Sequence, residues 1–267
     1  MSLTIADPSD NLSKTFYTRE FYEQGQVSSL RAAREVIPIV LELFRPRSVI
    51  DVGCGVGPWL AVFKEYGIED ILGVDGDYVD RSMLQIPETQ FISFDLEQPF
   101  ETGRQFDLVV SLEVAEHLPR ESAKTFVDSL TKLGPIILFS AAMPFQGGTH
   151  HVNEQWPEYW AEYFREKGYI VVDCIRSKIW RNENVSWWYS QNILVFAKPT
   201  QLERHPLLAR EVERTFVSQL SIVHPCNYLA KVESLNPSNL KLKKLLSLLA
   251  EVAWYRFIRM VRRLRSW

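Results

Sequence analysis

The 267-residue sequence has no run of about 18 consecutive apolar residues, so we expect no segment that spans a membrane. Its N-terminus lacks the basic start and apolar stretch of a secretory signal peptide, which argues against export. Only three cysteines are present, Cys54, Cys174 and Cys226, an odd count without metal-type spacing. These absences indicate a cytoplasmic protein, and 46% hydrophobic with 12% aromatic residues is sufficient for a packed core.

Charge is distributed unevenly along the chain. The formal net charge is −3, but residues 241–267 carry eight lysines and arginines against one acidic residue, a net of +7, which leaves −10 for residues 1–240. An acidic body argues against a broad phosphate-binding surface for long nucleic acids. The tail has the apolar stripe and arginine-rich flank of a helix on an anionic membrane, which would place the protein at the inner membrane face. The alternative, which we rank first from sequence, is docking on the acidic body or self-association.

Short apolar runs alternate with helical patterns through the middle of the chain. Strands are predicted at 48–52, 70–75, 90–95, 106–112, 134–141, 169–175 and 191–198, with helices at 58–67, 120–133 and 157–168. This alternation predicts an α/β fold with a doubly wound sheet, whose ligands lie beyond the carboxyl ends of the strands. We divide the chain into an N-terminal helical lid segment (1–47), a core (48–199) and a helical, basic C-terminal extension (200–267).

The first predicted strand runs into a glycine-rich turn, IDVGCGVGPWL (50–60). Such a turn lets the backbone approach a ligand closely and directs helix N–H groups at it. The spacing of Gly53, Gly55 and Gly57 is G-x-G-x-G, whereas a nicotinamide fingerprint needs G-x-G-x-x-G. No basic residue lies between Asp51 and Lys64, although a phosphate-binding loop normally carries one. A dinucleotide is therefore disfavoured.

In these residues the sequence resembles the class I S-adenosylmethionine-dependent methyltransferases, whose first motif is an acidic residue, one residue and G-x-G-x-G. The resemblance implies a Rossmann-like sheet of seven strands and carries over to later motifs: GVDGD ends the second strand, SFDLE follows the third, and FDLVVSLEVAEHL holds the fourth. It implies ribose binding by the second motif, adenine binding by the third, and passage of the fourth beside the methionine and sulfonium end. The cofactor-binding positions implied in this way are Asp51, Gly53, Gly55, Gly57, Asp75, Gly76, Asp95, Leu96, Ser111 and Leu112.

The stretch EVAEH (113–117) concentrates two carboxylates and an imidazole. It resembles the E-x-x-E-H motif that holds a divalent metal in the small-RNA 3′-terminal ribose methyltransferases and the ubiquinone-pathway O-methyltransferases. That resemblance implies a Mg²⁺ or Mn²⁺ site formed by Glu113, Glu116, His117 and His151. The paired histidines and the aromatic-Glu-Trp sequence of the RNA group are missing here. A metal-free alternative, in which Glu caps a helix and His packs near the cofactor, stays open and ranks first.

The segment after the fifth predicted strand reads AAMPFQGGTHHVNEQWPEYW (141–160). It resembles bacterial methyltransferases of glycan and natural-product pathways, in which a G-G-x-G-H-V-N-E-Q-like segment occupies this place. The resemblance implies a catalytic histidine that removes the acceptor proton. His151 aligns with it and is our first choice, and His150 is the alternative. Glu154 is expected only to be an acid favoured by a helix N-terminus.

Five of the eight tryptophans fall within residues 156–188. Such a density can form a wall against which a sugar or aromatic ring stacks. We predict that Trp156, Trp187 and Trp188 line the substrate pocket, and that Tyr22, in the lid segment, covers it; the alternative for each is core packing.

Taken together, the motifs predict a cytoplasmic enzyme that O-methylates a sugar or another hydroxylated small molecule. Within enzymes, the alternatives are transfer to nitrogen or carbon of a small molecule, or to an RNA 3′-terminal ribose. In a different class, the chain is a cofactor-binding scaffold without activity.

Overall fold

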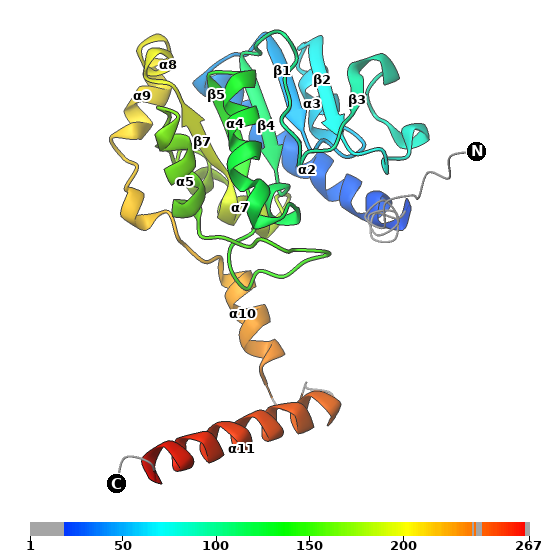
Figure 1. The fold of residues 1–267 in the computed structure, drawn as a ribbon. Coiled ribbons are helices and arrows are strands. Elements are labelled where there is room, and N and C mark those ends of the chain that lie inside the picture. Colours follow the sequence, from blue (N-terminus) through cyan, green and yellow to red (C-terminus); the bar gives the residue numbers. More distant parts are fainter. Residues whose placement is uncertain (1–18, 237, 239–241, 265–267) are drawn as a thin grey trace, which may run out of the picture. The chain divides into compact units, whose positions relative to one another are not determined.

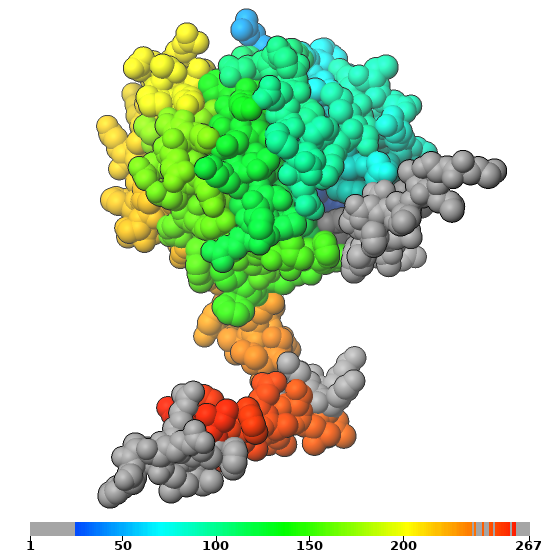
Figure 2. Space-filling view, in the orientation of Figure 1, coloured from blue at the N-terminus to red at the C-terminus, as the bar shows by residue number. Residues whose placement is uncertain are grey.

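The computed structural model describes residues 19–236, 238 and 242–264. Within residues 19–24 and at several positions of the last helix only the backbone is described, so the side chain of Tyr22 lies outside the described part. The chain divides into two compact units, with the boundary between residues 222 and 223. Side chains close the gaps between the ribbons of the first unit (Figures 1 and 2).

A seven-stranded sheet forms the centre of the first unit, in the order β3-β2-β1-β4-β5-β7-β6 (Figure 1). Its strands are β1 Ser48–Val52, β2 Asp70–Asp75, β3 Phe91–Ser93, β4 Leu108–Leu112, β5 Ile136–Ser140, β6 Ile170–Val172 and β7 Leu194–Ala197. The first five strands are parallel, and β7 runs antiparallel to β5 and β6. The predicted seven-stranded, doubly wound fold is confirmed. Strand order reverses between β1 and β4, which is where such sheets bind ligands.

Helices cover both faces of the sheet. They are α2 Arg19–Leu43, α3 Pro58–Glu65, α4 Ala123–Leu133, α5 Pro157–Glu166, α6 Arg176–Ile179, α7 Trp187–Asn192, α8 Pro199–Arg204 and α9 Pro206–Val212, with 3-10 turns η1 Arg81–Met83, η2 Glu88–Gln90, η3 Ala115–His117, η4 Arg120–Ser122 and η5 Val217–Gln219. Because strand side chains alternate between faces, Val49 and Val110 pack with α2 and α3, whereas Ile50 and Val109 pack with α4 and α5. Two cores result, one on each face.

The first unit extends further along the chain than the predicted core, which ended at residue 199. Leu208 on α9 is fully buried in one core, and Leu220, just after η5, is buried in the other. These contacts tie residues 200–222 to the sheet. The second unit contains α10 Pro225–Ser234 and α11 Leu242–Leu264.

Candidate active site

The glycine turn after β1 adopts a backbone that only glycine accepts without strain. Gly53, Gly55 and Gly57 have φ of 86°, 53° and 84°, in the left-handed region. A Cβ on Gly53 would lie 2.3 Å from a methyl group of Val114, so no larger residue fits there. Gly57 is the N-cap of α3, whose first residue, Pro58, is well suited to a helix start. The turn therefore exposes backbone at the carboxyl end of β1.

Asp75, the last residue of β2, is buried against this turn. Its Oδ2 accepts a hydrogen bond from the backbone N–H of Gly55 at 2.6 Å, and its Oδ1 accepts from Gly76 N–H at 2.7 Å and from the Tyr78 hydroxyl at 2.6 Å. Burial raises the pKa of Asp75, and the bonds from Tyr78 and the two amides oppose that rise. Because a carboxylate oxygen accepts two bonds, Oδ2 keeps one free position, while Tyr78 occupies the second on Oδ1.

The other predicted cofactor positions differ in exposure. Asp51 is only 3% exposed. Burial raises the pKa of Asp51 well above its usual range, and the nearby Asp75 carboxylate adds a smaller rise. Asp95 is exposed and its carboxylate accepts from the N–H of Glu97 at 3.0 Å, whereas Leu96 is buried.

On β4, Ser111 is fully buried, and its hydroxyl has no hydrogen-bond partner within the described part of the chain. Leu112, the next residue, lies at the cavity described below. An unsatisfied buried hydroxyl has a cost in free energy that a ligand or water can relieve.

A cavity of about 450 Å³ opens beside the glycine turn. Its lining residues come from α2, the turn, the end of β4, the segment 146–151 and α7: Gly25, Gln26, Ser28, Ser29, Asp51, Gly53, Cys54, Gly55, Val56, Pro58, Trp59, Leu112, Glu113, His117, Gln146, Gly147, Gly148, Thr149, His151, Trp187, Trp188 and Tyr189. Trp187 and Trp188 thus line this cavity, and their contact with a substrate stays a prediction. Trp156 does not belong to this wall and is 44% exposed, because it precedes α5 as its N-cap residue. No lysine or arginine is among these described lining residues.

Glu113 leaves β4 in a strained conformation, with φ of 56°. Its backbone N–H donates to the Ser140 carbonyl and hydroxyl oxygens, both at 3.0 Å, and its carboxylate accepts from the side-chain amides of Gln146 and Asn192, each at 3.0 Å. Burial raises the pKa of Glu113, and the bond from Asn192 is the largest opposing effect. Two amides from distant segments therefore fix this carboxylate.

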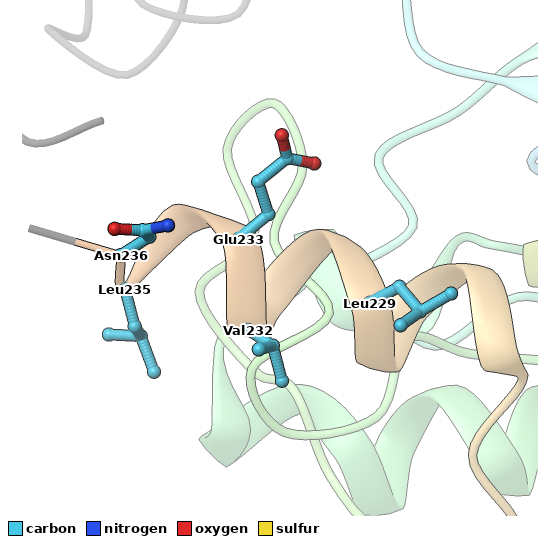
Figure 3. Close-up of a pocket in the computed structure, with 5 residues that line it drawn as sticks. All are labelled: Leu229, Val232, Glu233, Leu235 and Asn236. Atoms are coloured by element: carbon cyan, nitrogen blue, oxygen red, sulfur yellow. The ribbon is translucent and has the colours of Figure 1, made fainter. Parts of the chain in front are cut away.

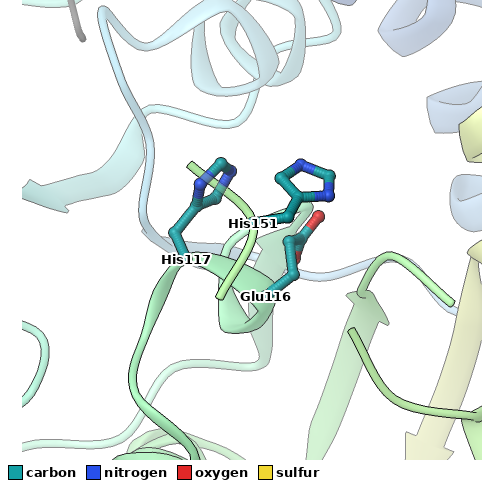
Figure 4. A group of neighbouring side chains, drawn as sticks. All are labelled: Glu116, His117 and His151. Carbon is teal, nitrogen blue, oxygen red and sulfur yellow. The ribbon is translucent and has the colours of Figure 1, made fainter. Parts of the chain in front are cut away.

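Glu116, His117 and His151 form a compact group (Figure 4). One ligand-type atom of each lies within 4.8 Å of the others, and the Glu116 carboxylate points toward the His151 ring in Figure 4. Of the four predicted metal ligands, the structure brings these three together. Glu113 lies outside the group because its carboxylate is turned toward Gln146 and Asn192.

Burial sets the protonation chemistry of this group. Glu116 is fully buried, and neither of its carboxylate oxygens has a hydrogen-bond partner among the described residues. Burial raises the pKa of Glu116 well above its usual range, and the neighbouring Glu113 carboxylate adds a smaller rise. Burial, with a smaller effect from His151, lowers the pKa of His117 to about 4. At neutral pH the His117 ring is thus uncharged and able to act as a ligand.

Glu154 holds His151 and the loop before it. One carboxylate oxygen lies 3.1 Å from His151 Nδ1 and accepts from Gly147 N–H at 2.5 Å, and the other accepts from Phe145 N–H at 2.7 Å. A Cβ on Gly148 would lie 2.2 Å from His151 Nε2, so a glycine is needed there. With Nδ1 bonded to a carboxylate, Nε2 is available as an acceptor. This role of Glu154 differs from the helix-terminal one expected from the sequence, although a spacing of three residues from His151 was a signal for it.

His150 is placed differently from His151. It is exposed, has φ of 57° and is not part of the cavity wall. Its backbone carbonyl lies 3.3 Å from His117 Nδ1. Of the two predicted catalytic histidines, only His151 reaches the cavity, and there it can accept a proton or bind a cation.

Comparisons with known proteins agree on a family. A family model described as a methyltransferase domain matches residues 24–192. The chain is 30% identical over 142 residues to a protein of Oryza sativa subsp. japonica named probable tocopherol O-methyltransferase, chloroplastic, covering 42% of this chain and 36% of that protein. It is also 30% identical over 102 residues to the ubiquinone biosynthesis O-methyltransferase, mitochondrial, of Dictyostelium discoideum, covering 32% of this chain and 31% of that protein. The chain thus spans about a third of the length of these relatives.

Among solved structures, an O-methyltransferase family protein from Burkholderia thailandensis matches with a TM-score of 0.50 and 17% identity. The match covers 70% of this chain and 62% of that one. At this identity the likeness shows a shared fold.

Proposed function

The chain belongs to the methyltransferase domain family, as a class I S-adenosylmethionine-dependent member, and we propose that it methylates a hydroxyl oxygen of a sugar or a similar hydroxylated small molecule. The observation that carries this proposal is the position of His151. His151 lines the cavity that the glycine turn also lines, and Glu154 lies 3.1 Å from its Nδ1, which leaves Nε2 as the acceptor. Methyl transfer to a hydroxyl needs a proton acceptor at such a place.

The residues at the carboxyl ends of β1, β2 and β4 fit S-adenosylmethionine. Asp51 is a buried carboxylate at the cavity wall and would bind the amino group of the methionine part. Asp75 would accept the ribose hydroxyls through the free position on Oδ2 and the position that Tyr78 now occupies. Asp95 with Leu96 would meet the adenine, and Ser111 with Leu112 the sulfonium end. When bound, the cofactor supplies an electrophilic methyl group.

The protein's own part in the reaction is to align and deprotonate the acceptor. His151 would take the hydroxyl proton on Nε2, and the resulting positive ring would be stabilised by the Glu154 carboxylate at Nδ1. Burial keeps the His117 ring neutral beside it, since the pKa of His117 is about 4. His117 therefore adds no positive charge that would oppose protonation of His151.

Glu116, His117 and His151 also fit a divalent cation such as Mg²⁺ or Mn²⁺. The Glu116 carboxylate is buried and has no hydrogen-bond partner within the described residues. Burying it as an anion costs much free energy unless a cation balances its charge or a proton neutralises it. A cation bound to His151 Nε2 would occupy the lone pair that otherwise accepts the proton, and it would instead supply charge that lowers the pKa of the acceptor hydroxyl. Glu113, fixed by two amides, would border the site. The metal-free alternative leaves Glu116 protonated, consistent with its raised pKa.

The cavity wall supports an uncharged, ring-shaped acceptor. Trp187, Trp188 and Tyr189 offer aromatic faces on which a sugar ring can stack. The described lining residues include no lysine or arginine, so they offer no cation to a phosphate group. This composition disfavours an RNA end and favours a small molecule. The assignment to oxygen also draws on the two curated relatives named as O-methyltransferases.

The test is formation of S-adenosylhomocysteine from S-adenosylmethionine with a panel of sugars and phenols. We expect His151→Ala to abolish turnover while cofactor affinity is kept, and the neighbouring His150→Ala to serve as the matched control with near wild-type turnover. The reverse pattern would assign the base to His150. EDTA should remove activity and Mn²⁺ restore it if the cation is bound; full activity in EDTA would exclude the metal. No product with any acceptor would leave the scaffold alternative.

A further inference from the structure

The second unit exposes a series of large apolar side chains. Val232 on α10 and Leu235, which directly follows the helix, point to one side while Glu233 points to the opposite side, and Leu229 lies one turn earlier (Figure 3). On α11, the exposed members are Leu242, Leu246, Leu249, Val252, Trp254 and Tyr255, each more than half exposed. Soluble proteins rarely leave so many large apolar groups together without a binding partner.

Basic residues bracket the apolar part of α11. Lys243 and Lys244 stand in its first turn, and Arg256, Arg259, Arg262 and Arg263 in its last three turns, against the single acidic residue Glu251. Arg256 and Arg259 are exposed, and the Arg259 guanidinium lies 5.2 Å from the centre of the Tyr255 ring. Apolar side chains with a tryptophan and a tyrosine, flanked by cations, are suited to the boundary between lipid chains and headgroups.

From these observations we infer that α11 binds the surface of an anionic lipid bilayer. The helix would lie in the interface, with Leu242, Leu246 and Leu249, which share one face, among the acyl chains and its arginines extending to the lipid phosphates. None of the helices among the described residues is long and apolar enough to cross a membrane. This inference does not depend on the proposed methyl transfer.

Two other occupants fit the observations less well. Pairing of α11 with the α11 of a second copy would bring together tails with a net charge of +7 each, which would repel one another. Nucleic acid would use the arginines but leave the exposed leucines in water. Of these three occupants, an anionic bilayer satisfies both the apolar groups and the charge.

The test measures co-sedimentation of the full chain with vesicles of phosphatidylcholine, alone or mixed with an equal amount of phosphatidylglycerol. We expect binding to the anionic vesicles, weakened by salt. Arg256→Ser with Arg259→Ser should lower affinity about fivefold per arginine, and Leu246→Glu with Leu249→Glu should lower it by more than about tenfold. The matched controls lie in the first unit: Arg204→Ser with Arg210→Ser for charge, and Val217→Glu for an exposed apolar group.

Each other outcome would overturn the inference. Three of these outcomes are no binding of the wild type to either vesicle, a loss of affinity in the first-unit controls equal to that in the α11 variants, and arginine variants that lose affinity while leucine variants keep it. A fourth is a dimer, detected by light scattering, that dissociates in the Leu246→Glu and Leu249→Glu variant while the wild type binds no vesicles. Circular dichroism and the thermal midpoint of each variant establish that the first unit remains folded.

Discussion

Substitution of Glu154 by Gln tests how the candidate base is held. The Glu154 carboxylate has three donors near it, the N–H groups of Phe145 and Gly147 and His151 Nδ1, and its side chain is only 19% exposed. A glutamine keeps one acceptor oxygen but turns an NH₂ group toward a donor. At least one of the three groups therefore loses its acceptor, although the fold of the sheet is untouched.

The size of the effect follows from the charge. A hydrogen bond to an ionised group contributes about 1.5–3 kcal/mol, which corresponds to roughly a 10- to 100-fold change in rate if it is lost in the transition state. We expect Glu154→Gln to lower turnover by that factor. Because Glu154 is not among the residues of the cofactor turn, affinity for S-adenosylhomocysteine should stay near that of the wild type.

The assay combines initial rates of S-adenosylhomocysteine formation, calorimetric cofactor affinity and the thermal midpoint. Glu158→Gln is the matched control, since Glu158 is a first-turn glutamate of α5 whose carboxylate accepts from Ser221 and not from His151. Turnover within about twofold of the wild type would refute the positioning role of Glu154. An equal loss in Glu158→Gln, or a parallel loss of cofactor affinity, would refute it too.

Three further changes test separate parts of the site. For His117, burial lowers the folded-state pKa to about 4 from an ordinary 6.5, so the unfolded chain takes up the proton first and stability is lost as pH falls through this window. In urea unfolding with EDTA present, the free energy of unfolding of the wild type should fall between pH 7 and pH 4 by up to about 3 kcal/mol more than that of His117→Gln. Equal falls in the two proteins would contradict the lowered pKa of His117. Tyr78→Phe vacates a position on Asp75 Oδ1, so calorimetry should show tighter binding of S-adenosylhomocysteine, up to about tenfold; weaker binding would show that Tyr78 itself contacts the cofactor. Trp187→Ala should raise the acceptor KM, while Trp156→Ala, an exposed control, should leave it unchanged; equal effects would remove Trp187 from the acceptor wall.

Much of the fold follows from local patterns in the sequence. Buried strands appear as short apolar runs because both sheet faces are covered, and all five residues of β4 and of β5 are buried. Gly53 and Gly57 were recognisable because the turn between β1 and α3 needs positive φ, which a glycine pattern reveals. Burial of Leu208 and Leu220 is not visible in local patterns, since it depends on contacts with distant parts of the chain.

The candidate site shows the same division. By itself, the sequence determined which segments end at one edge of the sheet, and therefore that EVAEH and the 141–160 segment face the cofactor turn. Only the tertiary structure decided which side chains meet there. EVAEH forms a 3-10 turn that begins at Ala115, and positive φ at Glu113 directs its carboxylate to Gln146 and Asn192. Those partners lie 33 and 79 residues away along the chain, so no local periodicity encodes the choice; it is made by packing of β5 and α7 against the end of β4.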